Sequence, residues 1–188
     1  MLTMPVEAGE KAEREYVLEA GRLMVISART APKSRGEDDI LAALIHGEEK
    51  EKLAEEMFKL AEERKGTWRR DAISVQNSDA VILLGVRGAK PLGLSCGACG
   101  YKNCEEYGKA EKKPGRDFRG PLCLFKILDL GIALGSAAKT ASLLNVDNRI
   151  MYRVGVAAMR LGLMPEADVI MGIPISARGK NIYFDRKT

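Results

Sequence analysis

The hydrophobic and polar positions of this 188-residue chain repeat with more than one period, and the first third predicts helices joined by a loop. Residues Glu7–Ile26 carry apolar side chains every three to four positions, which indicates an amphipathic helix. A second helix is predicted from Glu48 to about Lys65, because acidic residues crowd its first turn and Gly66 follows its end. Between them, residues 27–39 (SARTAPKSRGEDD) read as a loop. The short apolar run Ile40–Ile45 fits either a helix or a strand.

The remainder of the chain predicts buried strands separated by helices. Ala80–Val86 and Val169–Ile173 are unbroken apolar runs, as expected for strands in the middle of a sheet. Leu124–Leu144 is rich in small residues and nearly uncharged, which predicts a helix packed closely in a core. Another helix is predicted over Asn148–Leu161, with Asn148 as its cap and Gly162 just beyond its end.

The composition suits one folded domain outside the membrane. Apolar residues make up 46% of the chain and charged residues 30%, which excludes disordered, collagen-like and membrane classes. The net charge is only +4, and Trp68-Arg69-Arg70 reads as a loop with a single aromatic ring, so nucleic acid is not expected as a partner. No segment has the ~20 uncharged residues of a membrane helix, and the start lacks the apolar core of a secretory signal. We expect one α/β (α+β) domain over residues 1–188, located in the cytoplasm.

Four cysteines carry the clearest chemistry, and they lie in a glycine- and charge-rich insert at about residues 88–123. Cys96, Cys99 and Cys104 fall within nine residues (SCGACGYKNC), and Cys123 follows nineteen positions later. In a reducing cytoplasm this grouping indicates metal or redox chemistry more often than disulfides or unrelated buried thiols. Four thiolates are the usual ligands of a 4Fe–4S cluster, and the glycines let backbone amides turn toward sulfur. Zinc is the alternative, although a zinc ribbon normally supplies a second close CxxC pair.

The run CGACGYKNCEEYGKA resembles the small cluster-binding domain of the corrinoid iron–sulfur protein and of electron-transport ferredoxin subunits. Those domains carry CGxCGxxxC, then a helix, then a distant fourth cysteine near a proline. Pro121-Leu122-Cys123 supplies the last element, with the proline before the cysteine rather than after it. The resemblance covers about thirty residues and implies that the four cysteines together hold one cluster.

The rest of the chain resembles the flavin-dependent nitroreductase family. An early helix leads to ARTAPKSRG, and DLGIALGSAAKTASLL is later followed by VGVAAMRLGL, in the order that this family has. The resemblance implies a nitroreductase-like sheet flanked by helices, an FMN cofactor, and flavin sites formed between the subunits of a homodimer. The chain departs from the family where an Arg-rich segment should grip the flavin phosphate, since it has EKAEREYVLEAGR there. Gly36 also replaces the Asn of the family's loop.

Two basic loops are the candidates for contacts with the flavin phosphate and ring. The second loop belongs to the tail, residues 176–188, which reads as irregular. Cationic side chains and glycines that permit close backbone approach suit a phosphate, provided that the sheet brings both loops together. The alternative is two solvated basic loops. The residues are Arg29, Lys33 and Arg35 in the first loop, Gly172 in the strand before the tail, and Arg178, Gly179, Lys180 and Arg186 in the tail.

ARTAPK, the clustered cysteines, VDNRIMY and GIPISARGKNIYFDR also resemble a family of uncharacterised archaeal and bacterial proteins described as containing a ferredoxin domain. This resemblance is nearly full length. Three functional hypotheses follow from the sequence. The first is a redox protein with a 4Fe–4S cluster and a flavin, which exchanges electrons with a partner protein or reduces a substrate. The others are a zinc-stapled binding module without enzymatic activity, and an electron carrier without a substrate pocket.

Overall fold

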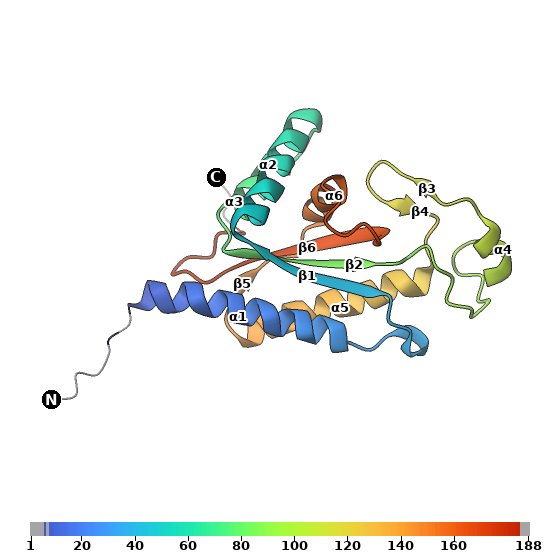
Figure 1. The fold of residues 1–188 in the computed structure, drawn as a ribbon, viewed down its shortest axis with the longest axis horizontal. Coiled ribbons are helices and arrows are strands. Elements are labelled where there is room, and N and C mark those ends of the chain that lie inside the picture. Colours follow the sequence, from blue (N-terminus) through green and yellow to red (C-terminus); the bar gives the residue numbers. More distant parts are fainter. Residues whose placement is uncertain (1–5, 7, 185–188) are drawn as a thin grey trace.

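The computed structural model describes residue 6 and residues 8–184, and this part of the chain forms a four-stranded sheet between layers of helices (Figure 1). The strands pair in the order β1-β2-β6-β5, and each neighbouring pair is antiparallel. We call one end of the sheet the Val86 end, where Ile40 and Val169 flank Val86, and the opposite end the Ala80 end. The strands are β1 (Ile40–His46), β2 (Ala80–Val86), β5 (Asp147–Asn148) and β6 (Val169–Ser176).

Helices cover both faces of the sheet. α1 (Gly9–Thr30) and α5 (Leu124–Leu143) lie side by side on one face, while α2 (Gly47–Glu63), α3 (Trp68–Gln76) and α6 (Tyr152–Arg160) cover the other (Figure 1). The side chains of β2 alternate between two cores, since Ile82 and Leu84 pack on the α1–α5 side and Val81 and Leu83 on the other side. β2 is therefore buried along its whole length, which confirms its predicted place in the middle of the sheet. No helix in the described part is long and apolar enough to span a membrane.

Several predicted elements are present with shifted ends. The first helix continues to Thr30, so the start of the predicted loop 27–39 is helical. The predicted first residue of this helix, Glu7, lies outside the described residues. The ambiguous run Ile40–Ile45 is strand β1, which pairs with β2 along its length. Asn148 was predicted to cap a helix, but it pairs with Ile175 in the sheet, and α6 begins only at Tyr152. Strand pairing thus prevailed over the capping preference of asparagine.

The residues Trp68-Arg69-Arg70, predicted as a loop, form the first turn of α3. Trp68, Ala72 and Val75 recur at helical spacing and are buried in the core that α3 shares with α2 and α6. The guanidinium groups of Arg64 and Arg153 lie 5.0 and 5.4 Å from the Trp68 ring centroid. The i, i+4, i+7 spacing of these three residues is the pattern from which this helix could have been predicted. The pattern extends over only two turns, because α3 has nine residues.

The cysteine-rich segment leaves the Val86 end of the sheet and returns to it (Figure 1). The two ends of the segment meet, because the Cys123 amide donates to the Gly88 carbonyl at 2.8 Å. The Arg119 amide also donates to the Asp168 carbonyl, which anchors the returning strand beside β6. The segment contains α4 (Cys104–Lys109), β3 (Lys113–Pro114) and β4 (Arg119–Gly120).

Candidate cofactor site

All four cysteines line one small pocket beside the Val86 end of the sheet. Cys96 and Cys99 belong to the loop before α4, Cys104 is the first residue of α4, and Cys123 directly precedes α5. The structure therefore brings together the four residues that the spacing of the sequence grouped. Four soft sulfur donors around one space suit a thiolate-bound metal group. The other walls of the pocket are mostly apolar, with Pro91, Leu92, Leu94, Tyr107, Leu124 and Phe125 among them.

The four cysteines that line this pocket carry thiols that are not joined to one another. All four cysteines lie in the described part of the chain and are free thiols. Among the described residues, no three Cys, His, Asp or Glu side chains lie close enough together to hold a single metal ion. The sulfurs of a tetrahedral zinc site are only about 3.8 Å apart, because each Zn–S bond is about 2.3 Å long.

The loop between Ser95 and Cys104 turns through backbone conformations that favour glycine. Gly97 and Gly100 have φ values of 72° and 86°, and Ser95 itself has a φ of 49°. This turn aims the Ser95 amide at sulfur, and its N–H donates to Cys104 Sγ at 3.2 Å. Amide donors of this kind stabilise the charge on a thiolate and set the potential of a sulfur-bound cluster. The sequence prediction that glycines let amides point at sulfur is consistent with this geometry.

Tyr107 closes the base of the pocket. It is 1% exposed, and its single hydroxyl proton is shared between two acceptors, the carbonyls of Pro121 at 3.0 Å and Gly88 at 3.2 Å. Burial raises the pKa of Tyr107, and the nearby charges of Cys123 and Cys99 raise it further, so the phenol stays neutral. It therefore joins the two ends of the cysteine-rich segment and keeps water from the inner wall of the pocket.

The first two cations of the first basic loop, Arg29 and Lys33, hydrogen-bond to the backbone of the loop and of the strand β1 that follows it. Arg29 forms an ion pair with Asp38 and also donates to the Ile40 carbonyl. Lys33 Nζ donates to the Ala31 carbonyl at 2.9 Å. These contacts hold the connection between α1 and β1 in one shape.

The same loop is attached to α5 and to the cysteine pocket. The amide and hydroxyl of Ser34 donate to Asp129 Oδ1 at 2.9 and 2.8 Å, while Asp129 Oδ2 is buried without a hydrogen-bond partner. Arg35 Nη1 donates at 3.2 Å to the carbonyl of Leu92, a residue that lines the cysteine pocket. The first basic loop thus lies directly against the cysteine-rich segment.

A buried ion-pair network joins this region to the first turn of α5. Lys126 is 0% exposed, and its Nζ lies 2.6 Å from Asp39 Oδ2 and 3.5 Å from Glu37 Oε2. Lys90 Nζ lies 3.3 Å from Asp39 Oδ2. Burial raises the pKa of Asp39, but the two lysines outweigh burial and lower the pKa below its usual range. The pattern of the sequence gave no sign of this network, because its members come from separate segments.

The second basic loop lies at the Ala80 end of the sheet. Arg178 is paired with Asp79 at 3.2 Å, Gly179 and Lys180 are exposed, and Arg186 lies outside the described residues. Gly172 serves packing, because a Cβ on it would lie 2.0 Å from Val154 Cγ1 of α6.

The two basic loops do not form one pocket within a single chain. The first follows the end of α1 (Figure 1), whereas Arg178 and Gly179 line a pocket with Glu10 and Arg14 of the first turns of α1. The 22 residues of α1 separate the loops by about 33 Å at 1.5 Å per residue. The condition on which a shared phosphate site depended, that the sheet brings the loops together, is therefore not met within one chain. The antiparallel order is the reason, since β1 begins at the end of the sheet opposite to the one where β6 finishes.

The solved structures that this fold resembles include nitroreductases and oxidoreductases, some of them with FMN in their names. Nitroreductase CinD from Lactococcus lactis, solved with nicotinic acid, has a TM-score of 0.58 at 14% identity over 97% of this chain and 84% of that chain. A nitroreductase with bound FMN from Desulfitobacterium hafniense has a TM-score of 0.56 at 13% identity over 96% of this chain and 82% of that chain. Others are longer, and this chain spans 58–67% of their length. The predicted fold class is confirmed.

The sequence itself assigns the family. Residues 119–186 match the family described as "uncharacterized protein containing a ferredoxin domain" (DUF2148). An uncharacterized protein from Archaeoglobus fulgidus is 50% identical over 174 residues, which cover 93% of this chain and 94% of that protein. The chain therefore belongs to this ferredoxin-domain family, as its motifs predicted.

Proposed function

We propose that this protein is a redox protein that holds one 4Fe–4S cluster on its four cysteines and an FMN between the subunits of a homodimer. It would act in electron transfer or in the reduction of a substrate. The observation that carries the proposal is the single pocket lined by Cys96, Cys99, Cys104 and Cys123 on a nitroreductase fold. When bound, the cluster supplies one-electron chemistry and the flavin supplies one- and two-electron chemistry.

The spacing of the cysteines favours a cluster over a zinc ion, because a zinc ribbon normally supplies a second close CxxC pair and Cys104 and Cys123 lie nineteen positions apart. A cubane spreads its four thiolates over separate iron corners, whereas zinc draws them to one point. The apolar wall formed by Leu92, Leu94 and Phe125 would shield a cluster from water. The Ser95 amide would stabilise the thiolate of Cys104, and the ring of Tyr107 would exclude water from the buried side.

The cysteine pocket has one open side, which suits exchange of electrons with a partner protein. Cys96 is exposed, Cys99 and Cys104 are half-buried, and Cys123 is buried. A cluster held by these residues would therefore present the Cys96 corner to the surface. An electron donor or acceptor protein would dock over this corner, because electron transfer needs a short path.

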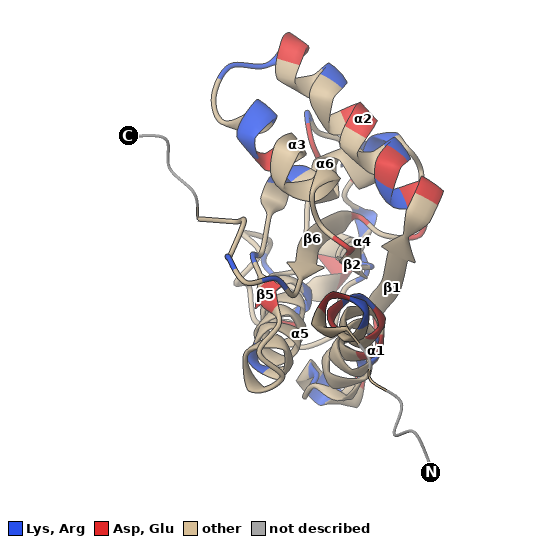
Figure 2. Ribbon diagram, turned by 90° about the vertical axis from the view of Figure 1, so that its left-hand side faces the viewer, with Lys and Arg blue, Asp and Glu red and all other residues tan. Residues whose placement is uncertain are grey.

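The outer face of α1 and α5 supports a homodimer. Ile26 on α1 is exposed, as are Leu124, Leu128 and Ile132 on one stripe of α5. Gly131 lies on the same stripe, and a Cβ on it would meet no atom within 4 Å. Figure 2 shows that α5 carries few charged residues, whereas α2 is crowded with them. A continuous apolar helical face with small residues fits a second copy of the chain.

A dimer also resolves the separation of the two basic loops. The resembled nitroreductases build their flavin sites between subunits, so the tail of one subunit and the first basic loop of the other would share one FMN. Arg178, Gly179 and Lys180 would lie on the phosphate side. Because Arg35 donates to Leu92 of the cysteine pocket, the first basic loop would place the flavin near the cluster. Electrons would then have a short route between the two groups.

A reductive titration tests this proposal. Protein purified without oxygen is titrated with dithionite while the visible spectrum is recorded. A cluster and an FMN together should take up about three electrons per chain, one for the cluster and two for the flavin. Uptake of about two electrons would mean that the protein holds a flavin without a cluster. Uptake of about one would mean that it holds a cluster without a flavin, as an electron carrier does. A colourless protein that takes up none contradicts the proposal.

A further inference from the structure

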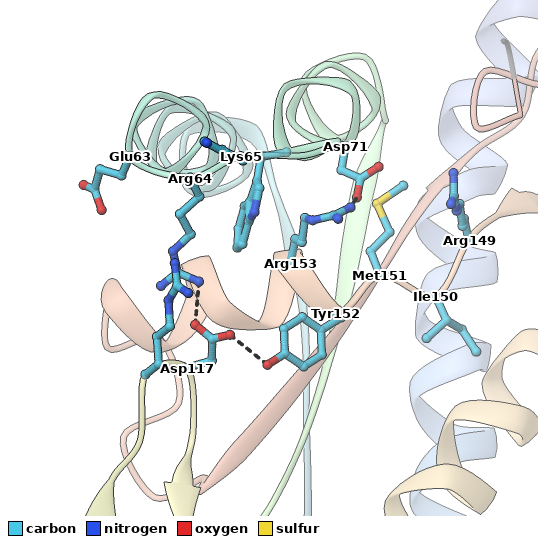
Figure 3. Close-up of a pocket in the computed structure, with 12 residues that line it drawn as sticks. Glu63, Arg64, Lys65, Asp71, Asp117, Arg149, Ile150, Met151, Tyr152 and Arg153 are labelled. Atoms are coloured by element: carbon cyan, nitrogen blue, oxygen red, sulfur yellow. Dashed lines mark hydrogen bonds and ion pairs between the residues drawn. The ribbon is translucent and has the colours of Figure 1, made fainter.

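A separate polar pocket lies on the face of the sheet opposite to α1 and α5 (Figure 3). Its walls come from the connection between α2 and α3, the tip of the β3–β4 hairpin, and the segment that enters α6. The cavity volume is about 760 Å³, within the range of small-molecule sites. Because its walls come from three distant segments, no motif in the sequence indicated it.

Cations outnumber carboxylates in this pocket, and every carboxylate already has a cationic partner. Glu63 pairs with Arg160, which lies outside the pocket, at 2.8 Å. Asp71 pairs with Arg153 at 2.5 Å. Asp117 pairs with Arg64 at 2.5 Å and accepts the Tyr152 hydroxyl at 2.9 Å (Figure 3). The pocket residues with a formal charge are Arg64, Lys65, Arg116, Arg149 and Arg153 against Glu63, Asp71 and Asp117.

Three of the five cations have no carboxylate at ion-pair distance within the described residues, although the charge of Arg116 helps to lower the pKa of Asp117. Within the described part of the chain, Lys65 and Arg116 make no hydrogen bond and no ion pair, and both are exposed. Arg149 donates to the Tyr183 carbonyl at 3.2 Å and faces the Phe184 ring, so no carboxylate balances it. The first turn of α6 opens on the same pocket, and in the described chain it has no acidic residue and no side-chain cap at Met151. Its positive helix end adds to the three cations.

We propose that this pocket binds a small organic phosphate of nucleotide size. Arginine forks match the paired oxygens of a phosphate group, and Lys65 adds a point charge. Arg116, Arg149 and Lys65 would hold the phosphates, and the half-exposed ring of Tyr152 with Ile150 would contact the organic part. The Trp68 ring is not available for stacking, because the guanidinium groups of Arg64 and Arg153 lie over it.

The proposed phosphate pocket is distinct from the proposed flavin site. The candidate flavin-phosphate residues Arg178 and Gly179 lie at the Ala80 end, beside the first turns of α1. Arg116, in contrast, belongs to the hairpin of the cysteine-rich segment. The bound phosphate would therefore contact the segment that carries the cysteines, and the inference does not depend on a flavin being present.

Calorimetric titration of the full chain with ADP and with inorganic pyrophosphate tests this inference. Both should bind the wild type, and Arg116→Gln and Arg149→Gln should each weaken binding by at least about tenfold, because each removes a charged contact to phosphate. Arg119→Gln is the matched control, since Arg119 lies on the same hairpin but outside the pocket.

Several results would overturn the inference. Absence of binding by the wild type at millimolar ADP and pyrophosphate is one. A loss with Arg119→Gln equal to that with Arg116→Gln would indicate general surface charge rather than a site. Citrate binding as tightly as pyrophosphate would show that the pocket does not select phosphate. Thermal melting of each variant checks its fold, and if Arg149→Gln melts early, Lys65→Gln at an exposed position takes its place with the same expectation.

Discussion

Among single residues, the buried ion pair of Lys126 and Asp39 gives the clearest prediction for the free energy of unfolding. Asp39→Asn would leave the buried Lys126 charge facing only Glu37, and it should lower the free energy of unfolding by about 3 kcal/mol at neutral pH. Because the folded pKa of Asp39 is lowered, the pair contributes fully above the ordinary pKa of 3.8 and loses its contribution as pH falls through the folded pKa. The difference between variant and wild type should therefore shrink in acid.

Urea unfolding of Asp39→Asn at neutral pH and at about pH 3 measures this effect. Asp38→Asn is the control, because Asp38 is 41% exposed and its pair with Arg29 should contribute less than about 1 kcal/mol. An Asp39→Asn variant as stable as the wild type at neutral pH would show that the buried network does not support the fold.

The tail residues Arg178 and Lys180 are the candidates for the flavin phosphate. The double variant Arg178→Ala with Lys180→Ala should weaken FMN at least about a hundredfold, since each charged contact to phosphate contributes about 1.5–3 kcal/mol. Riboflavin lacks the phosphate and should lose much less. Quenching of flavin fluorescence measures both affinities, with Arg69→Ala on the far face as the control. Equal losses for FMN and riboflavin would remove the phosphate role.

At the scale of elements, the contact of α6 with β6 depends on glycine. A Cβ on Gly155 would lie 1.6 Å from the backbone oxygen of Ile170, and a strand backbone cannot move aside easily. Gly155→Ala should therefore destabilise the protein by at least about 2 kcal/mol and lower its Tm by at least about 4 °C. Gly108→Ala is the control, because that helical glycine has open space around it. Calorimetry that finds the two variants equally stable would contradict this packing.

The sequence predicted the individual helices and strands better than it predicted the long-range contacts between them. Continuous apolar runs identified β2 and β6, because strands covered on both faces need apolar side chains at every position. The start of α6 could not be predicted from Asn148, because its pairing with Ile175 is a long-range contact. Likewise, the nine-residue α3 gains its stability from burial of Trp68 rather than from propensity.

In the candidate sites too, local groupings could be predicted from the sequence and long-range contacts could not. The cysteine grouping was visible because three of the four lie within nine residues, so local spacing alone brings them together. The separation of the two basic loops was not visible, since it depends on the direction in which β1 and β6 run. The pocket of Arg116 and Arg149 joins segments that only the folded chain places side by side.

For the whole molecule, the proposed flavin site requires a dimer whose interface is formed by α1 and α5. Leu128→Glu places a charge on the exposed apolar stripe of α5 and should convert a dimer into a monomer at micromolar concentration. Ile73→Glu is the matched control, because Ile73 is similarly exposed on α3 at the opposite face. Light scattering measures both. A wild-type monomer, or a Leu128→Glu variant that remains a dimer, would remove this interface.

The metal and sulfide content of anaerobically purified protein shows whether the four cysteines hold one 4Fe–4S cluster. We expect about four iron atoms and about four sulfides per chain, with no stoichiometric zinc. Cys104→Ser should lose most of this iron while the helical circular dichroism persists, because the side chains around the cysteines form a small cluster of their own, apart from the two cores of the sheet. Lys109→Gln, exposed on the same short helix, should keep full iron. One zinc per chain without sulfide, or full iron in Cys104→Ser, would contradict the account.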